Sequence, residues 1–320
     1  MQRRSRDRGR RCISAWEIIM RIVAALVLLC VSGSVFAQVS SWIPVEIENG
    51  LVIVPITLNG EPARAMLDTG ASGNFISQYF LDAHEGEYAT GQGVIVTSPN
   101  EKRRTAMANN IMLGIFGTEF EIDQLVPVYY DDFDFIIGLP FFELFVVQID
   151  YPGRRMRIMD HASIDMKKLA NVKMRRDGGS GPPQVRVELN GEVKTWLMLD
   201  TGNAGRLMYG RSNAERRGWL EKYAVTQGEA VGVNSVSSEI DLFRLPTLTI
   251  GPFEMENVLV GVSAGDFSIE RTRRDSRTTG FRLKKGGSKK TDGILGFDVL
   301  QHYIVTIDMR RNRLNLDIPR

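Results

Sequence analysis

The sequence repeats one short pattern, an apolar run that stops at Asp-Thr-Gly. The first copy spans Met66–Gly70 and the second spans Met198–Gly202. In each copy, a run typical of a buried strand ends at an acid, a hydroxyl residue and a glycine, which favours a tight turn that holds the carboxylate at the strand end. One copy alone is equally well explained as an ordinary loop, because all three residues are common in turns. Two copies after similar runs favour a shared function for the two acids, Asp68 and Asp200.

The residues before each copy repeat as well. The run Leu51–Leu58 is rich in β-branched residues and ends at Asn59-Gly60, and the alternating run Val185–Leu189 ends at Asn190-Gly191. Asn-Gly between two apolar runs is a strong signal for a β-hairpin. We therefore expect each acid to lie at the end of the second strand of a hairpin.

The residues after each copy complete the repeat. Ile136–Gly138 matches Ile294–Gly296, and Val147–Asp150 matches Val305–Asp308. Matching segments that recur once in the same order indicate an internal duplication. Further strands or hairpins are expected at Gly91–Thr97, Asn110–Ile122, Met156–Met159, Leu245–Ile250, Val258–Val262 and Arg313–Leu316, while Asn74–Leu81 fits either a short helix or a strand.

The length and composition fit two globular domains. The chain has 320 residues, of which 43% are hydrophobic, and both values are ordinary for a protein of this kind. We expect an N-terminal lobe at residues 38–160 and a C-terminal lobe at residues 184–320. Residues 161–183 are charged and end in a stretch rich in glycine and proline, so we interpret them as an interlobe linker.

The first 37 residues have the features of an export signal. Basic residues continue to Arg21, an apolar run covers Ile22–Val31, and small residues precede the expected cleavage after Ala37. We expect a signal peptide at residues 1–37 and an exported protein, periplasmic or secreted; an uncleaved membrane anchor is the alternative. Translation from Met20 would give a more compact signal, which N-terminal sequencing would test. Both cysteines, at positions 12 and 30, lie in this segment, so the remainder offers no disulfide and no cysteine nucleophile.

The positive charge is concentrated in two places. The formal net charge is +2, but arginines crowd the N-terminus and a second basic cluster occupies residues 271–290, which have no counterpart in the first repeat. The rest of the chain is close to neutral, which argues against a nucleic-acid partner. Three readings of the basic insertion stay open: a solvated loop, contact with an anionic membrane or envelope surface, and a site of self-cleavage. Its basic residues are Arg271, Arg273, Arg274, Arg277, Arg282, Lys284, Lys285, Lys289 and Lys290.

Other catalytic chemistries find little support in the sequence. The three histidines, His84, His161 and His302, are isolated, and none has the spacing of a zinc ligand to another. The chain also contains neither the Gly-x-Ser-x-Gly pattern of serine hydrolases nor a glycine-rich phosphate loop. We expect no metal and no cofactor, and we interpret the histidines as surface or packing residues.

The two turns and the two closing glycines together resemble the aspartic peptidases. The architecture is similar to the two-lobed pepsin-like enzymes, and the lobe size is similar to the bacterial retropepsin-like proteins. The resemblance covers nearly all of the chain after residue 37. It implies an all-β fold of two homologous β-barrel lobes, related by a pseudo-twofold axis, with a cleft between them.

The resemblance also implies roles for individual residues. Asp68 and Asp200 would be the catalytic pair at the floor of the cleft. Thr69 and Thr201 would lock the turns together by reciprocal hydrogen bonds, and glycines 70 and 202 would let the backbone approach the carboxylates. Two carboxylates at close range cannot both be ionised easily, so they would share one proton and supply acid and base together.

The implied reaction is hydrolysis of a peptide bond by a water molecule that the aspartates activate. Peptides or proteins would be the substrates, and the presence of both lobes in one chain makes a monomer the simplest assembly. A flap hairpin is expected near Gly91–Pro99, with Gly91, Gly93 and Val94 as its candidate residues. This stretch lacks the tyrosine found in the pepsin flap, so its role is inferred from position alone.

The sequence departs from the pepsin pattern directly after each turn. Pepsin-like enzymes place a hydroxyl residue there that donates to the catalytic carboxylate, whereas this chain has Ala71 and Asn203. Loss of a donor to the ionised form raises the pKa of a carboxyl group. We therefore expect a pH optimum less acidic than that of the stomach enzymes.

A non-enzymatic function is the main alternative. In that reading the duplicated fold is an envelope protein that binds extended peptides without cutting them. The presence of both aspartates argues against a function in binding alone, because a binding protein does not need a like-charged pair.

Overall fold

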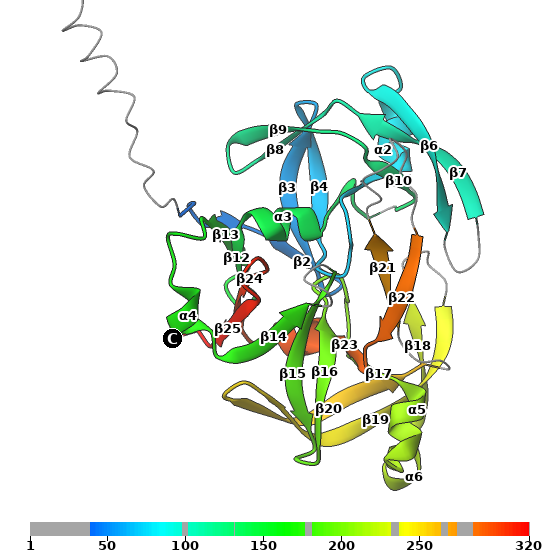
Figure 1. Ribbon diagram of the computed structural model, residues 1–320, viewed down its shortest axis with the longest axis vertical. Coiled ribbons are helices and arrows are strands. Elements are labelled where there is room, and N and C mark those ends of the chain that lie inside the picture. The colour runs from blue at the N-terminus through cyan, green and yellow to red at the C-terminus, as the bar shows by residue number, and fades with distance from the viewer. Residues whose placement is uncertain are drawn as a thin grey trace, which may run out of the picture. The chain divides into compact units, whose positions relative to one another are not determined.

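The computed structural model describes residues 39–97, 102–130, 132–176, 181–231, 237–263, 268–273 and 284–319 (Figure 1). Strands make up 53% of it, and the helices are short, which confirms the all-β prediction. The expected signal peptide lies outside the described residues. Within the described ranges, no helix is long and apolar enough to span a bilayer.

The elements follow the order that the repeat predicts. The first half contains β1 (Ile43–Pro44), β2 (Glu46–Glu48), β3 (Leu51–Leu58), β4 (Glu61–Leu67), β5 (Phe75–Ser77), α2 (Gln78–Ala83), β6 (Ala89–Thr97), β7 (Lys102–Asn109), β8 (Ile111–Ile115), β9 (Thr118–Ile122), β10 (Val126–Val128), β11 (Phe135–Ile137), α3 (Leu139–Leu144), β12 (Val146–Asp150) and β13 (Arg155–Met159). The stretch 74–81, which fitted either a helix or a strand, contains one of each.

The second half repeats this order with longer central strands. It contains α4 (Met166–Leu169), β14 (Val172–Arg176), β15 (Pro183–Leu189), β16 (Val193–Leu199), β17 (Leu207–Tyr209), α5 (Arg211–Arg216), α6 (Trp219–Lys222), β18 (Thr226–Val231), β19 (Ser237–Ile250), β20 (Phe253–Val262), β21 (Ser268–Arg273), β22 (Lys284–Lys290), β23 (Gly293–Leu295), α7 (Phe297–Leu300), β24 (Ile304–Asp308) and β25 (Arg313–Asp317).

The hairpins begin at the Asn-Gly turns, as predicted. Asn59 and Gly60 have φ angles of 50° and 86°, and Asn190 and Gly191 have φ angles of 56° and 65°. Positive φ at both central residues is the geometry that Asn-Gly favours in tight hairpins. A third such pair, Asn49-Gly50, joins β2 to β3 with φ angles of 49° and 84°.

The two halves differ in how far their barrels close. In the second half, six strands form a closed barrel in the order β15-β16-β23-β17-β20-β19, because β19 also pairs with β15. The first half has the matching order β10-β5-β11-β4-β3-β8-β9 and forms a half-barrel. The stretch that would match the long strand β19 is split at Asn110, which has a φ of 59° and lies between β7 and β8. The prediction of two barrels is thus complete only for the second half.

One sheet joins the two halves. Its strand order is β1-β13-β12-β24-β25-β14, so the closing hairpin of each half contributes two central strands. At its centre Gln148 pairs with Thr306, and the Gln148 Nε2 group donates to Thr306 Oγ1 at 2.8 Å. The two residues occupy equivalent positions of the repeat. The pseudo-twofold axis therefore passes between them.

The stretch 161–183, which we interpreted as a linker, contains ordered elements. α4 lies in it, and β14 pairs with both β25 and β15. In register, β14 corresponds to β1 and β2 of the first half, because Val172 pairs with Leu314 as Ile43 pairs with Met156. The structural repeat therefore begins near Val172. This is earlier in the chain than Val185–Leu189, the alternating run by which the sequence shows the second repeat.

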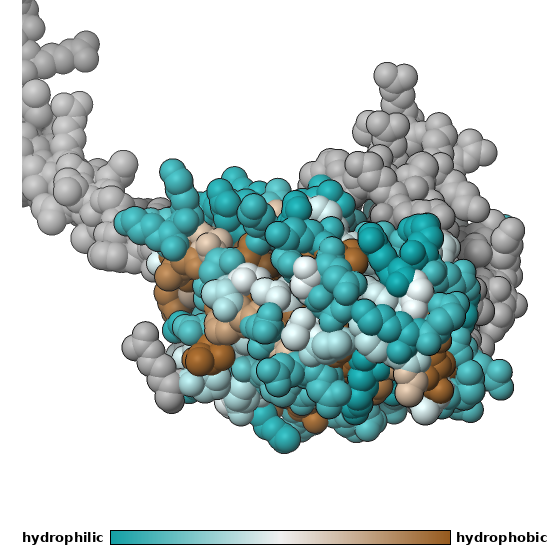
Figure 2. All heavy atoms as spheres, turned by 90° about the horizontal axis from the view of Figure 1, so that it is seen from below, coloured by the Kyte–Doolittle hydropathy of each residue, from teal (hydrophilic) through white to brown (hydrophobic). Residues whose placement is uncertain are grey.

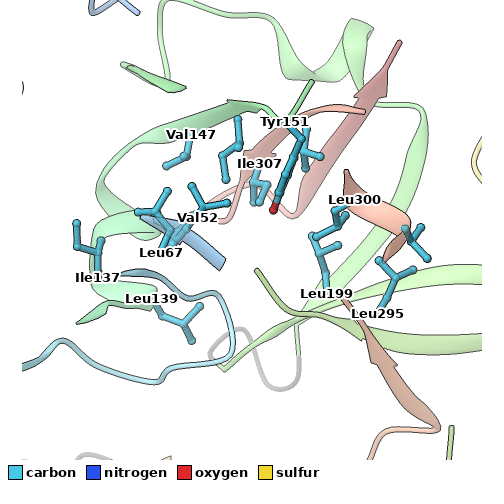
Figure 3. Close-up of a cluster of buried hydrophobic side chains, with 14 of the residues drawn as sticks. Val52, Leu67, Ile137, Leu139, Val147, Tyr151, Leu199, Leu295, Leu300 and Ile307 are labelled. Carbon is cyan, nitrogen blue, oxygen red and sulfur yellow. The ribbon is translucent and has the colours of Figure 1, made fainter. Parts of the chain in front are cut away.

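The hydrophobic core runs through both halves without a break. Figure 3 shows Leu67 and Ile137 on one side of Tyr151, and Leu199 and Leu295 on the other. All of these side chains are buried. Burial in one common cluster holds the two hairpin ends against each other, because separating them would expose apolar surface to water.

The basic insertion is not a loop throughout. Its described parts belong to β21 and β22, which pair antiparallel with each other, and residues 274–283 lie outside the described residues. Of the segment that we interpreted as a solvated loop, residues 271–273 and 284–290 thus lie in strands.

The surface seen from the end that carries α5 and α6 is mostly hydrophilic, with small apolar areas between polar side chains (Figure 2).

Candidate active site

Each Asp-Thr-Gly turn begins where a strand leaves a parallel partner. β4 runs parallel to β11, and β16 runs parallel to β23. The amide of Asp68 donates to the carbonyl oxygen of Ile137, and the amide of Asp200 donates to that of Leu295, each at 3.0 Å. The closing segments found in the sequence therefore fix the backbone at the point where each carboxylate starts.

The two turns are joined by four hydrogen bonds through their threonines. Thr69 Oγ1 donates to the Leu199 carbonyl at 2.7 Å and accepts from the Thr201 amide at 3.0 Å. Thr201 Oγ1 donates to the Leu67 carbonyl at 2.9 Å and accepts from the Thr69 amide at 3.0 Å. Both threonines are buried. Because each bond has a symmetric partner, the two turns are held at one fixed separation.

The glycines bring the carboxylates together. A Cβ atom on Gly70 would lie 2.8 Å from Asp200 Oδ1, and one on Gly202 would lie 2.7 Å from Asp68 Oδ1. Each carboxyl group therefore rests against the glycine of the opposite turn, where any side chain would displace it. The two carboxyl groups also hydrogen-bond to each other. Both aspartates remain partly exposed, so the pair is open to small molecules.

The two carboxyl groups have unequal surroundings. Asp68 Oδ1 accepts from the amides of Gly70 at 2.7 Å and Ala71 at 3.0 Å, whereas Asp200 Oδ1 accepts from the amide of Gly202 at 3.0 Å. Burial raises the pKa of Asp68, and the hydrogen bonds from Asp200 and the two amides offset part of this rise. Burial is the main cause that raises the pKa of Asp200 well above its usual range, followed by the charge and hydrogen bond of Asp68, and hydrogen bonds from the amides of Gly202 and Gly70 offset part of this rise. The pKa values of both carboxyl groups are therefore raised, which favours one proton shared between them.

The residues that follow the glycines do not donate to the carboxylates through their side chains. Ala71 has no donor, and the Asn203 side chain bonds instead to the Arg206 carbonyl at 3.4 Å and to the Gly205 amide at 3.2 Å. The amide of Ala71 reaches Asp68, while the amide of Asn203 donates to the carbonyl of Asp200. The absence of side-chain donors agrees with raised pKa values for both carboxyl groups.

The closing glycines also have a packing role. A Cβ on Gly138 would lie 2.8 Å from the Ala71 carbonyl oxygen, and one on Gly296 would lie 2.5 Å from Asn203 Cγ. In the first half, Asn74 Oδ1 accepts from the amide of Gly138 at 3.0 Å. No sequence pattern predicts this contact, because Asn74 lies in a stretch that fits either a helix or a strand.

Two tyrosines near the pair were also missed. Burial raises the pKa of Tyr130, and the charge of Asp68 adds to the rise. Burial likewise raises the pKa of Tyr151, with a further contribution from Asp200. Each hydroxyl therefore stays protonated at neutral pH and lies within electrostatic range of one aspartate. Neither tyrosine lies in a motif, so only the fold reveals them.

The predicted flap is a hairpin of β6 and β7. Gly93 pairs with Ala106 and Val94 pairs with Thr105, while Gly91 lies at an irregularity between Thr90 and Gly93. Residues 98–101, which join the two strands, lie outside the described residues. The hairpin therefore exists, and its action as a flap stays a prediction.

The histidines lie in packing or ion-pair positions. His84 stacks on Phe80 with ring centroids 4.1 Å apart, and His302 packs edge-on against Tyr303. His161 Nδ1 lies 3.2 Å from Asp308 Oδ1. Among the described residues, no group of three or more histidine, cysteine or acidic side chains is arranged to hold a metal ion.

This geometry offers an acid and a base at one place. An ionised and a protonated carboxyl group in hydrogen-bond contact can take a proton from one group and give a proton to another. The threonine hydrogen bonds fix the distance between the two turns. Because both turns have a glycine at the contact, no side chain stands between the two carboxyl groups. Such a pair suits addition of water to a polar double bond.

Comparisons with known families agree with this geometry. Residues 30–163 match the family described as retroviral aspartyl protease, and residues 185–299 match the family described as aspartyl protease. Each match contains one Asp-Thr-Gly turn and one closing glycine. A search of curated proteins gave no significant match. With one such match over each half of a duplicated β-fold, the chain is a two-lobed member of the retropepsin-like aspartyl proteases.

Proposed function

We propose that this protein is an aspartic endopeptidase in which Asp68 and Asp200 act on one water molecule. The observation that carries the proposal is the reciprocal contact of each carboxyl group with the opposite glycine. Together with the threonine bonds, this contact holds two acids in one site at hydrogen-bond range. Family membership independently indicates a peptide or protein substrate.

The unequal surroundings of the acids assign their roles. Asp68, the ionised partner, takes a proton from the water as its oxygen bonds to the carbonyl carbon of the peptide. Asp200 gives its proton to the carbonyl oxygen, so the tetrahedral species is a neutral diol. In the second half of the reaction, Asp68 passes its proton to the leaving nitrogen and Asp200 regains a proton from the diol. The acids return to their starting states when the C–N bond breaks.

A function in binding alone is less consistent with the site. Burial raises the pKa of both carboxyl groups, and the charge of Asp68 raises that of Asp200 further, which is unfavourable for folding at neutral pH. A peptide-binding protein would gain stability if either acid were replaced by an amide. Retention of both acids in a duplicated turn therefore supports hydrolysis.

The test is digestion of a peptide library by the full chain and by Asp68→Asn and Asp200→Asn, with and without pepstatin. We expect internal cleavage by the wild type, inhibition by pepstatin, and a loss of at least about 10³-fold in each variant, within the range found for removal of a general acid or base. Thr118→Ala, on the exposed strand β9, is the control and keeps full activity. Peptide binding without cleavage by the wild type would support the binding alternative, and cleavage that survives both substitutions would exclude the pair.

We also propose that the protein is exported and works as a monomer. The composition of residues 1–37 supports export, with cleavage after Ala37 or retention as an anchor. One chain supplies both aspartates, so no second copy is needed. The charge of residues 271–290 supports contact with an anionic membrane or envelope surface.

A further inference from the structure

The turn between β2 and β3 of the first half reaches the loop that follows Asp200 in the second half. Gly50 has a φ of 84°, and a Cβ atom on it would overlap the carbonyl oxygen of Ala204 and lie 2.8 Å from its carbonyl carbon. The same Cβ would lie 3.0 Å from Cδ1 of Phe297. The atoms it would meet include main chain, which cannot swing aside as a long side chain can. The absence of a side chain at position 50 therefore permits close contact between the two halves.

The loop that Gly50 touches positions the second carboxyl group. It begins at Gly202, whose amide donates to Asp200 Oδ1 at 3.0 Å. The carbonyl of Asn203 then accepts from the amide of Phe297 at 2.9 Å, and the carbonyl of Gly205 accepts from Asp298 at 3.1 Å. Ala204 lies between these two anchors. A shift of its peptide group would be transmitted to both anchors and, across two residues, to Gly202.

In the equivalent turn of the second half, the described glycine makes no such contact. Counted back from the paired strands, Gly181 occupies the position of Gly50, because Gln184 and Ile53 pair with Met198 and Met66 respectively. Gly181 has a φ of 100°, and a Cβ on it would meet no atom within 4 Å. Of these two glycines, Gly50 alone lies against the loop of an aspartate in the other half.

This asymmetry matches the difference between the two carboxyl groups. Asp68 accepts from two amides of its own loop, and Asn74 ties that loop to Gly138. Asp200 accepts from one amide of its own loop. The loop that holds its carboxylate by fewer bonds is the one that the other half supports.

We propose that Gly50 is a positioning residue, which fixes the Asp200 loop from the opposite half through Ala204 and Phe297 and so sets the contact between the two carboxyl groups. The kinetic test of this inference rests on the proposed function, because it measures peptide cleavage. It predicts that a side chain at position 50 acts mainly on the chemical step. Gly50 contacts the loop behind the acid, so binding of the peptide is affected much less.

The test compares Gly50→Ala with two control variants that carry the same backbone strain. Gly60 has a φ of 86° and Gly181 has a φ of 100°, and both have open space where a Cβ would stand. We expect kcat of Gly50→Ala to fall by roughly 10- to 100-fold, with KM changed by less than about threefold, because a displacement of about 1 Å can cost 10²-fold. Gly60→Ala and Gly181→Ala should stay within about twofold of the wild type. Equal kcat in all three variants would overturn the proposal.

A second measurement separates this inference from the proposed function. The carboxyl carbon of Asp200 is followed by NMR through a pH titration of ¹³C-labelled protein, which needs no activity. In Gly50→Ala the Asp200 signal should titrate at a lower pH than in Gly60→Ala, since displacement weakens its contact with Asp68. An inactive wild type would refute the proposed function alone, whereas identical titrations in the two variants would refute the role of Gly50.

Phe297→Leu tests the same contact if Gly50→Ala does not fold. The first half has Leu139 at the equivalent position, directly after its closing glycine. The substitution replaces the ring that faces Gly50 by a smaller side chain and adds no backbone strain. We expect a smaller loss of kcat, about threefold to tenfold, and an Asp200 titration displaced in the same direction as in Gly50→Ala. An unchanged kcat together with an unchanged titration would overturn the proposal.

Discussion

Apart from the threonine bonds and the carboxyl–glycine contacts that both turns share, the described contacts that hold the Asp68 loop lie within its own half, whereas the Asp200 loop also packs against Gly50 of the other half. In the first half, the amide of Ala71 reaches the carboxylate and Asn74 binds the closing Gly138. In the second half, the side chain of Asn203 is turned into its own loop, and Gly50 of the first half packs against Ala204. The same tripeptide is therefore supported in two different ways.

This difference separates two functions of the fold. The threonines and glycines of the two turns are nearly symmetric, and they set the separation of the carboxyl groups. The flanking residues are asymmetric, and they give the two loops different hydrogen-bond partners. A duplicated chain can therefore keep one geometry while its halves take up different chemical roles.

The largest expected effect tests the symmetric part. Thr69→Val and Thr201→Val each remove one hydroxyl and leave a buried amide and a buried carbonyl without partners. At about 1 to 3 kcal/mol for each unsatisfied group, we expect each variant to lower the free energy of unfolding by about 2 to 4 kcal/mol. Chemical denaturation measures the change, and Thr118→Val on exposed β9 is the control. Losses that differ by more than about 1.5 kcal/mol between the two variants would break the symmetry that we infer.

The next effect tests the asymmetric part. A carboxyl group whose pKa is raised in the folded state binds its proton more tightly there, so its contribution to stability is present below the unfolded pKa and is lost as pH rises through the folded pKa. The pKa of Asp200 is raised well above 3.8. Above pH 3.8, the wild type should therefore lose stability relative to Asp200→Asn until the pH exceeds the raised pKa.

Asp68→Asn gives the matched comparison. It leaves Asp200, whose pKa is raised well above its usual range, whereas Asp200→Asn leaves Asp68, whose carboxylate accepts from two amides of its own loop. At neutral pH we expect Asp200→Asn to be the more stable of the two variants in urea denaturation. The reverse order would show that Asp68, and not Asp200, holds the proton.

The smallest effect concerns the residue after the first glycine. Ala71→Ser adds a hydroxyl next to Asp68, the ionised partner, and a donor to the ionised form lowers a carboxyl pKa. We expect the acid limb of the pH–rate profile to move by a fraction of a pH unit toward lower pH. Ala71→Cys is the control, because it has nearly the same shape and only a weak donor. A shift toward higher pH in Ala71→Ser would contradict this account of the dyad.

Much of the fold could be predicted because its signals are local. Asn59-Gly60 and Asn190-Gly191 mark hairpins, since both residues accept positive φ. The acid at each strand end and the closing glycine recur in order, so the pairing of β4 with β11 and of β16 with β23 follows from the duplication. The location of the acid pair followed from the same repeat.

The remaining features depend on contacts between distant segments. β14 lies in a charged stretch and forms a strand only because β15 and β25 offer it hydrogen-bond partners. The open barrel of the first half results from a break at Asn110, whose amide binds Asp123. The contact of Gly50 with Ala204 joins positions far apart in the chain. None of these has a signature in a short window of sequence.

The most direct test of the dyad is a pH titration of the two carboxyl carbons by NMR in ¹³C-aspartate-labelled wild type, assigned with the Asp68→Asn and Asp200→Asn variants. We predict that both signals respond to each protonation step, that the proton resides mainly on Asp200, and that Asp200 titrates well above 3.8. Two signals that titrate independently, each near the ordinary value of an aspartate, would contradict the shared proton on which the proposed reaction depends.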